Sequence, residues 1–196
     1  MGALKLKACC SVPMRKKLRE GYEISPGRIT ANVGTDKIWE LMQGFIEEHD
    51  EPLFFILEIP AKAGDEPGDG SSLHRDVYYI DGLTREQAKT VLFRAGKLLI
   101  NDGMSEFGFG GHESSEEITF GKYNVLTVFA EDAERYRGFF EAYRIPEARP
   151  LITAWDTFSE FAPGSCSLYE DNGRTVYDLP EELNEFGIYF AERRED

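Results

Sequence analysis

The stretch Leu53-Phe54-Phe55-Ile56-Leu57-Glu58-Ile59 decides the class of fold. It is a short and almost continuous apolar run, which is typical of a central strand buried on both faces of a sheet. Pro60 follows it and cannot donate to a strand ladder, so the strand is expected to end there. Glu58 is the one charged residue of the run. Its place near the end of the strand predicts a half-exposed carboxylate, since an enclosed one would need partners.

Outside this run the spacing of apolar residues changes between a period of two and a period of 3.6, which indicates strands and helices in turn. Strands are predicted at residues 4–12, 28–33, 76–81, 106–109, 118–120, 123–130, 151–155 and 187–193. Helices are predicted at residues 35–48, 84–100, 132–144 and 180–186. We expect a single α+β domain over residues 1–196, with about three main helices covering a largely antiparallel sheet of about six to nine strands.

Local signals refine this expectation. Thr84 and Gln87 have the spacing of a capping box at the start of a helix. Asn172-Gly173 lies between two short strand-like segments and predicts a hairpin, because both residues tolerate positive φ. The strand, helix and strand over residues 123–155 fit a right-handed parallel crossover, which would make the sheet mixed. Residues 61–72 are polar and rich in glycine, and they predict a flexible loop.

The charge balance restricts the classes of partner. The chain has 196 residues, 41% of them hydrophobic, and a formal net charge of −14. It is too apolar to be disordered, and so much negative charge disfavours nucleic acid and anionic membrane surfaces as partners. Residues 1–19 contain six lysines and arginines and no acid, so they form a basic strand or arm. We expect this arm to lie against the acidic remainder of its own chain.

The cysteines and the apolar runs suggest a compartment. The lysines at positions 5 and 7 interrupt the early apolar residues, so no secretory signal is expected. The longest apolar run falls far short of the ~20 residues that span a bilayer. The three cysteines are an odd number, and Cys9 and Cys10 are adjacent, so no disulfide framework is expected and a cytoplasmic protein is predicted. A redox pair formed by Cys9 and Cys10 is the alternative.

The motifs for cofactors and metals are incomplete. The glycine-rich residues 107–111 lack a following lysine and precede an acidic run, which disfavours phosphate. A turn or bulge is expected there, with Phe107 and Phe109 packing on one face. Residues 65–76 match a calcium loop only in part, without flanking helices. The histidines at positions 49, 74 and 112 are expected to be separate surface residues. We therefore predict no cofactor and no metal.

A small set of residues could bind a partner. Trp155 with Asp156 offers an indole beside a carboxylate, which suits a lysine or arginine of a partner. The alternative places Trp155 in the core, with Asp156 capping the next turn. Glu113, Glu116 and Glu117 belong to an acidic run that could contribute to the same contact. No nucleophile, base or carboxylate pair stands out as catalytic, so the sequence leans against an enzyme without deciding the question.

Three functions remain open. The first is a cytosolic, acidic protein-binding module that meets a basic partner, with an inhibitor of the immunity-protein type as one form of it. The second is an enzyme or small-ligand receptor with a pocket built from the loops at 61–72, 103–117 and 156–165. The third is a homodimer joined through a sheet edge or an aromatic patch. The first is favoured because the chain is strongly acidic and no catalytic motif is recognised in it.

Overall fold

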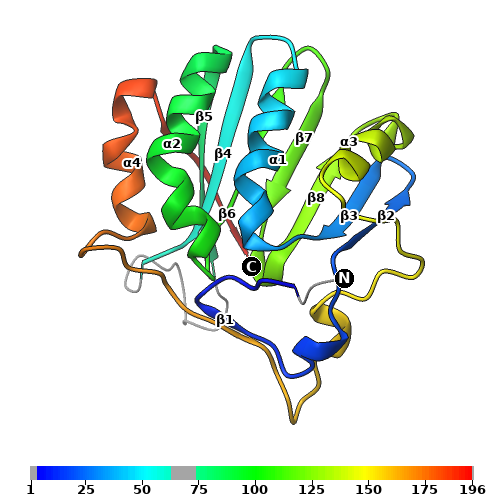
Figure 1. The fold of residues 1–196 in the computed structure, drawn as a ribbon. Helices are drawn as coiled ribbons and strands as arrows, with labels where there is room; N and C mark the ends of the chain where they lie inside the picture. The colour runs from blue at the N-terminus through cyan, green and yellow to red at the C-terminus, as the bar shows by residue number, and fades with distance from the viewer. Residues whose placement is uncertain (1–3, 63–73, 196) are drawn as a thin grey trace.

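The computed structural model describes residues 4–62 and 74–195. They form an antiparallel sheet of eight strands in the order β10-β5-β4-β6-β7-β8-β3-β2, with helices packed on it (Figure 1). The strands of this sheet are β2 (Gly21–Ser25), β3 (Arg28–Asn32), β4 (Leu53–Pro60), β5 (His74–Leu83), β6 (Glu106–Gly111), β7 (Glu116–Phe120), β8 (Val125–Phe129) and β10 (Tyr189–Glu195). The predicted α+β class with a largely antiparallel sheet is confirmed.

Two long helices, α1 (Thr35–Glu48) and α2 (Arg85–Asn101), lie side by side on one face of the sheet (Figure 1). The capping box predicted for Thr84 and Gln87 is present at the start of α2. The third predicted helix is shorter than expected. It consists of a 3-10 turn, η3 (Ala133–Tyr136), followed by α3 (Arg137–Ala142). A further short helix, α4 (Leu179–Glu182), follows the 3-10 turn η5 (Val176–Asp178).

The central strand β4 explains how the sheet presents two different faces. Leu53, Phe55 and Leu57 point to the helix side and are fully buried in the main core. Because strand side chains alternate, Phe54, Ile56 and Glu58 point to the opposite side. The helices α1 and α2 lie on the helix side only. On the opposite side Ile56 is buried while Phe54 and Glu58 are only partly buried, so the expectation of a strand buried on both faces is confirmed only in part. We call the opposite side the open face.

The predicted parallel crossover is wrong, because every pairing between named strands is antiparallel and residues 151–154 form no strand. The chain does return beside β2, where Tyr22 and Glu147 make one isolated parallel bridge. Pro146 and Pro150 flank this bridge, and neither has an N–H to donate to a ladder. The bridge therefore does not extend into a ninth strand of the sheet.

The predicted hairpin at Asn172-Gly173 is only partly correct. Both residues have positive φ, as the turn requires, and Asp171 bridges Arg174. The flanking segments, however, are not strands. Thr175 and Asp178 form a capping box that starts the turn η5 and leads into α4. The residues after the turn therefore form helical turns in place of the second strand of a hairpin.

The N-terminal segment differs from the predicted strand at residues 4–12. Only Cys10–Ser11 (β1) is a strand, and it pairs with Ser165–Cys166 (β9) beneath the large sheet. Lys7, expected on a wet face, is 1% exposed. Its Nζ donates to the carbonyl oxygens of Asp102 at 2.8 Å and Leu99 at 3.4 Å, at the C-terminal end of α2. The lysine therefore satisfies carbonyls that the helix leaves without partners.

The cysteines also differ from expectation. Cys10 and Cys166 lie opposite each other in the β1–β9 ladder, with their Cα atoms 4.4 Å apart, and they form a disulfide. This separation is within the range that a disulfide spans. Cys9 remains a free thiol. The expectation of no disulfide is therefore wrong, and the cysteines do not favour a reducing compartment.

Two predicted loops fall mainly outside the described residues. The predicted loop at 61–72 and the partial calcium loop at 65–76 lie largely in residues 63–73, which the structure does not describe.

Within residues 4–62 and 74–195, no helix has both the length and the hydropathy needed to cross a membrane.

The glycines of β6 provide a test of the sheet. A Cβ on Gly108 would lie 2.1 Å from the backbone oxygen of Ile118 on the neighbouring strand, whereas a Cβ on Gly138 of α3 would meet nothing within 4 Å. We predict that Gly108→Ala lowers the free energy of unfolding by about 1–3 kcal/mol, because the strands must separate to admit the methyl group. Gly138→Ala should be neutral or slightly stabilising. Urea unfolding measures both, and equal effects would contradict the register described.

The burial of Lys7 predicts a pH dependence. Burial lowers the pKa of Lys7 to about 7 from its ordinary 10.5, against the opposing influence of Asp102 and Glu106. Between these two pH values the unfolded chain holds a proton that the folded chain has released. The free energy of unfolding should therefore rise with pH in this window, by up to about 1.4 kcal/mol per pH unit, and should level off below about pH 7, where both states hold the proton.

The variant Lys7→Met isolates this effect, because the other titrating groups are common to both proteins. Urea unfolding at a series of pH values between about 7 and about 9 should give a rising difference in unfolding free energy between wild type and variant. Parallel curves would contradict the buried position of the ammonium.

Candidate functional site

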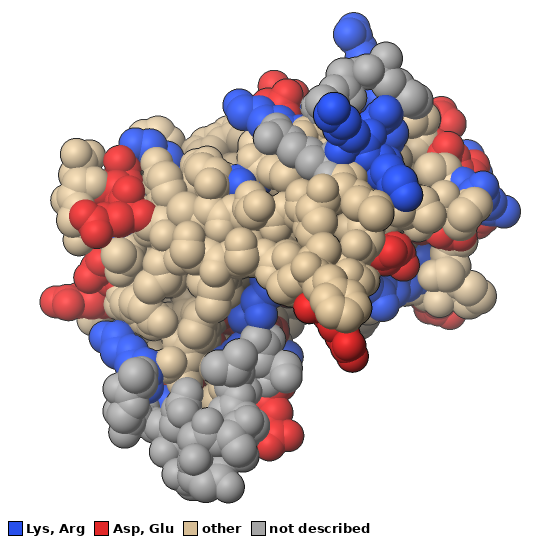
Figure 2. All heavy atoms as spheres, turned by 90° about the horizontal axis from the view of Figure 1, so that it is seen from below, with Lys and Arg blue, Asp and Glu red and all other residues tan. Residues whose placement is uncertain are grey.

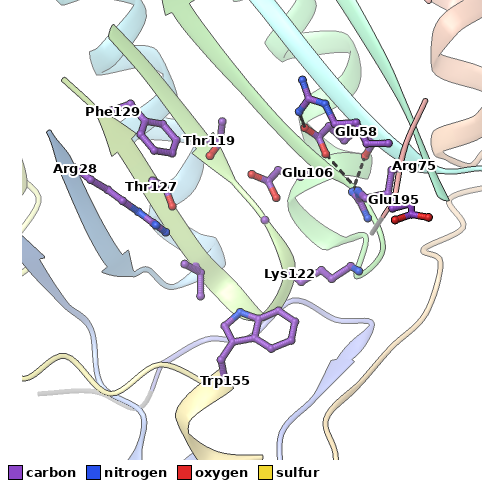
Figure 3. A pocket seen from close by; sticks show the side chains of 13 residues that line it. Arg28, Glu58, Arg75, Glu106, Thr119, Lys122, Thr127, Phe129, Trp155 and Glu195 are labelled. Carbon is purple, nitrogen blue, oxygen red and sulfur yellow. Dashed lines mark hydrogen bonds and ion pairs between the residues drawn. The ribbon is translucent and has the colours of Figure 1, made fainter. Parts of the chain in front are cut away.

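The open face of the sheet carries two adjoining hollows. They have volumes of about 400 and 300 Å³. Figure 3 shows the larger one, whose lining comes from several strands of the sheet and from the segment around Trp155 below it. The residues that line both hollows are Glu58, Glu106, Thr119, Phe129 and Arg194. The described lining therefore comes mainly from paired strands, and it includes Glu106 and Glu117 of the suggested segment 103–117, which lie in β6 and β7.

The floor of the open face is bare over β6. Gly108 pairs with Ile56 on one side and Thr119 on the other, so no side chain rises between them. The ring of Phe54 lies over Gly110, where a Cβ would be 2.1 Å from it. The expected turn or bulge at these glycines is thus a regular strand, while Phe107 and Phe109 pack on the helix side as predicted.

Four carboxylates line the hollows, those of Glu58, Glu106, Glu117 and Glu195, and the larger hollow is also lined by the cations Arg28, Arg75, Lys122 and Arg194. Glu58 and Glu106 stand directly opposite each other in the β4–β6 ladder, an arrangement of like charges that destabilises a sheet. Burial raises the pKa of Glu117, and the charges of Glu106 and Glu58 raise it further. Removing a proton from Glu117 is therefore costly until a positive charge approaches.

These carboxylates differ in how they are balanced. Glu58 pairs with Arg75 at 3.3 Å and with Arg194 at 3.1 Å (Figure 3). In the described part of the chain, the carboxylates of Glu106 and Glu117 make no hydrogen bond or ion pair. The face therefore combines one satisfied carboxylate with two that retain the capacity to accept hydrogen bonds.

Aromatic rings border the hollows. Trp155 lies at the lower rim of the larger hollow and is 53% exposed (Figure 3). Its ring packs edge-on against Tyr123 with centroids 4.8 Å apart, which holds the indole in place. Phe129 lines both hollows, and Tyr79 lines the smaller one. Rings next to carboxylates form a surface on which a cation can be held.

The structure brings together some of the predicted partner-binding residues. Trp155 lines the larger hollow and Glu117 the smaller, so the two belong to one face. The alternative of a core tryptophan is wrong. Asp156 accepts hydrogen bonds from the backbone N–H of Thr153 at 2.8 Å and from its hydroxyl at 2.7 Å, and the pKa of Asp156 is lowered by these bonds. Its carboxylate therefore closes a local turn.

Glu116 and Glu113 lie elsewhere. Glu113 is exposed in the turn between β6 and β7. Glu116 follows the strand alternation to the helix side and is 6% exposed. There its Oε2 lies 2.8 Å from Nε2 of His49, accepts from the hydroxyl of Tyr136 at 2.8 Å, and pairs with Arg135. Burial raises the pKa of Tyr136. Glu116 therefore belongs to an internal polar cluster.

The histidines do not form one site. His49, expected on the surface, is buried at the C-terminal end of α1. The ring of His49 stacks on the ring of Phe45, with their centroids 3.8 Å apart. His112 is exposed, with Nε2 3.2 Å from a carboxylate oxygen of Asp81. Within residues 4–62 and 74–195, no group of three or more histidines, cysteines and acids is arranged to hold a metal ion.

The acids are spread along the described chain, and some of them are paired. Many acids contact cations of the same chain, as in the pairs of Glu20 with Lys37 and of Asp76 with Arg193. Figure 2, which views the molecule from below, shows uncharged residues over most of the middle and charged residues mainly toward the edges. A broad acidic surface is therefore not the feature that would select a partner. The unpaired carboxylates of the open face are the more specific feature.

Comparison of the chain with models of protein families, with curated proteins and with solved structures finds no match. Function therefore has to be argued from the geometry of the site, not from kinship or from the fold.

Sequence reasoning missed several residues of the open face, above all Glu106, Phe129 and Arg194. Their common position depends on the strand order, in which only β5 and β4 lie between β10 and β6. The alternation within residues 53–59 could have indicated that Glu58 shares a face with Phe54 and Ile56. Nothing in the sequence could have paired Glu58 with Arg194, 136 positions away.

The internal cluster predicts unequal effects within one acidic run. Glu116→Ala removes the acceptor shared by His49, Tyr136 and Arg135, and we expect it to lower the free energy of unfolding by about 3 kcal/mol or more. Glu113→Ala changes an exposed carboxylate three residues away and should change stability by less than about 0.5 kcal/mol. Thermal and urea unfolding measure both. A similar small loss for the two variants would show that the cluster contributes nothing.

Proposed function

We propose that the protein is a binding module that receives a cationic side chain of a basic protein partner on the open face of its sheet. One observation carries the proposal: the carboxylates of Glu106 and Glu117 lie in adjoining hollows without a cation of the described chain paired to them. The rim of the same hollows is aromatic. This combination suits a lysine or arginine side chain.

Repulsion among the carboxylates of the open face supports the proposal. Glu58, Glu106 and Glu117 repel one another, and the raised pKa of Glu117 reflects that repulsion together with burial. A guanidinium or ammonium group entering the hollow would relieve the repulsion and would lower the raised pKa of Glu117. Relief of this repulsion would therefore contribute to the free energy of binding.

The aromatic rim adds an anchor. Trp155 is exposed at the edge of the hollow, where a partner would cover it, and tryptophan is among the residues that contribute most to protein interfaces. The net charge of −14 would attract a basic partner over a longer range and raise the rate of association at low salt. In the finer form of the proposal the partner is a basic enzyme, which the protein inhibits as immunity proteins do.

A small cationic molecule is the second candidate. The hollows, at about 400 and 300 Å³, are of the size that small ligands occupy, which supports a receptor for such a molecule. The third candidate, a homodimer, draws on exposed apolar residues beneath the sheet. These are Met14, Ile152, Trp155, Phe161 and Leu168.

The proposal predicts selective binding of a guanidinium group. L-Argininamide should bind with a Kd on the order of millimolar, as expected for one inserted side chain. L-Citrullinamide, which has nearly the same shape without the charge, should bind at least about tenfold more weakly. Chemical-shift changes of backbone amides in β6, β7 and β8 measure both affinities and locate the site.

Variants sharpen this test. Glu117→Gln and Glu106→Gln should each weaken argininamide binding about tenfold, whereas Glu113→Gln, on an exposed turn, should leave it unchanged. Raising the salt from about 0.05 M to about 0.5 M should weaken binding as well. Equal binding of argininamide and citrullinamide, or shifts confined to other surfaces, would refute the proposal. Binding of argininamide in the micromolar range would favour the small-molecule receptor.

A further inference from the structure

A disulfide lies beneath the large sheet, where the two strands that it joins form only a short ladder. The strands β1 and β9 contribute only two residue pairs, Cys10 with Cys166 and Ser11 with Ser165. Two further backbone bonds extend this contact, from Ser167 N–H to Cys9 O at 2.9 Å and from Gly103 N–H to Ser167 O at 3.1 Å. The disulfide is therefore the one covalent tie in a weakly paired region.

The tie holds a distinct part of the molecule, which we call the lower layer and define as residues 4–19 and 150–169. Figure 1 shows these segments below the sheet. Tyr169 packs against the main core. The layer's buried apolar residues Leu4, Val12, Leu18 and Ala154 form a separate small cluster together with Tyr123, which lies outside the layer. Cys10 and Cys166 pack against this cluster and are themselves only partly buried, so a reductant can reach them.

The lower layer also reaches the open face. Trp155 belongs to it, and its ring contacts Phe158 of the same layer with centroids 5.5 Å apart. The position of Trp155 at the rim of the larger hollow therefore depends on how firmly residues 150–169 are held. We infer that the Cys10–Cys166 disulfide is a redox switch that fixes the lower layer, and with it Trp155, when oxidised and releases it when reduced.

The chemistry requires a dithiol reductant. Its thiolate attacks one sulfur of the Cys10–Cys166 bond and forms a mixed disulfide, and its second thiol then displaces the protein sulfur. The two cysteines gain two electrons and two protons, and the reductant leaves as a disulfide. Afterwards the layer is held without a covalent bond, by the short ladder, the small cluster and hydrogen bonds such as those from Asn32 Nδ2 to the carbonyl oxygens of Arg19 and Ile152.

The main core should survive this change. It contains its own large set of buried residues on the helix side of the sheet, and Lys7 still ties the N-terminal segment to the end of α2 through Asp102. The structure thus favours a local loosening over global unfolding, because regions with few buried contacts open first.

The experiment uses the full chain carrying Trp39→Phe, which leaves Trp155 as the sole tryptophan. Amide hydrogen exchange and Trp155 emission are compared before and after treatment with dithiothreitol. Reduction should speed up exchange in residues 4–19 and 150–169 on the order of tenfold, with little change in β4, β6 and β7, and it should shift the Trp155 emission to longer wavelength.

Two variants serve as controls. Cys10→Ser with Cys166→Ser should behave as the reduced protein under all conditions, and Cys9→Ser should respond to the reductant as the wild type does. Unchanged exchange in the lower layer on reduction, or peptide mapping of the oxidised protein without a Cys10–Cys166 link, would overturn the inference.

The effect on binding rests on the proposed function and is measured separately. Reduction should weaken argininamide binding severalfold, because Trp155 no longer closes the rim. If neither form binds argininamide while exchange still responds to the reductant, the proposed function fails and the switch stands.

Discussion

The buried pair of Lys7 and Asp102 is the constraint on which the arrangement of the molecule depends. The backbone oxygen of Asp102 accepts from Lys7, and its carboxylate accepts from the backbone N–H groups of Met104, Ser105 and Tyr169. The end of α2, the approach to β6 and the lower layer therefore meet at one enclosed polar point. Because buried polar groups are costly when any partner is lost, this contact holds Lys7 and Tyr169 at the end of α2, including when the disulfide is reduced.

From this point the sheet acquires its two unlike faces. The helices cover the side that carries Leu53, Phe55 and Leu57, and the other side is left to polar and aromatic residues. Strand alternation then separates neighbours that look alike in the sequence. Glu116 turns inward to His49 and stabilises the fold, and Glu117 turns outward to the hollow, where its charge is available to a ligand. One acidic run thus has two roles.

The sequence was sufficient where the signal was local. The apolar run at 53–59 and the capping box at Thr84 depend on nearby residues, and both elements formed as predicted. It was insufficient where distant segments decide the outcome. The burial of Lys7 needs the carbonyls at the end of α2, and the Cys10–Cys166 disulfide needs two segments brought into one ladder. For the site, Trp155 and Glu117 could be chosen by residue type, but Glu106 and Arg194 required the strand order.

The order of the strands also affects how the chain can be made. β10 pairs with β5, and Cys10 is joined to a residue 156 positions later, so many contacts are long-range. Ribosomes add roughly 5–20 residues per second, and residues 4–19 therefore spend several seconds or more without their final neighbours. During that time Leu4, Val12 and Leu18 are open to solvent or to chaperones. The nascent protein thus exposes apolar residues for a time during synthesis, although these residues are buried in the folded protein.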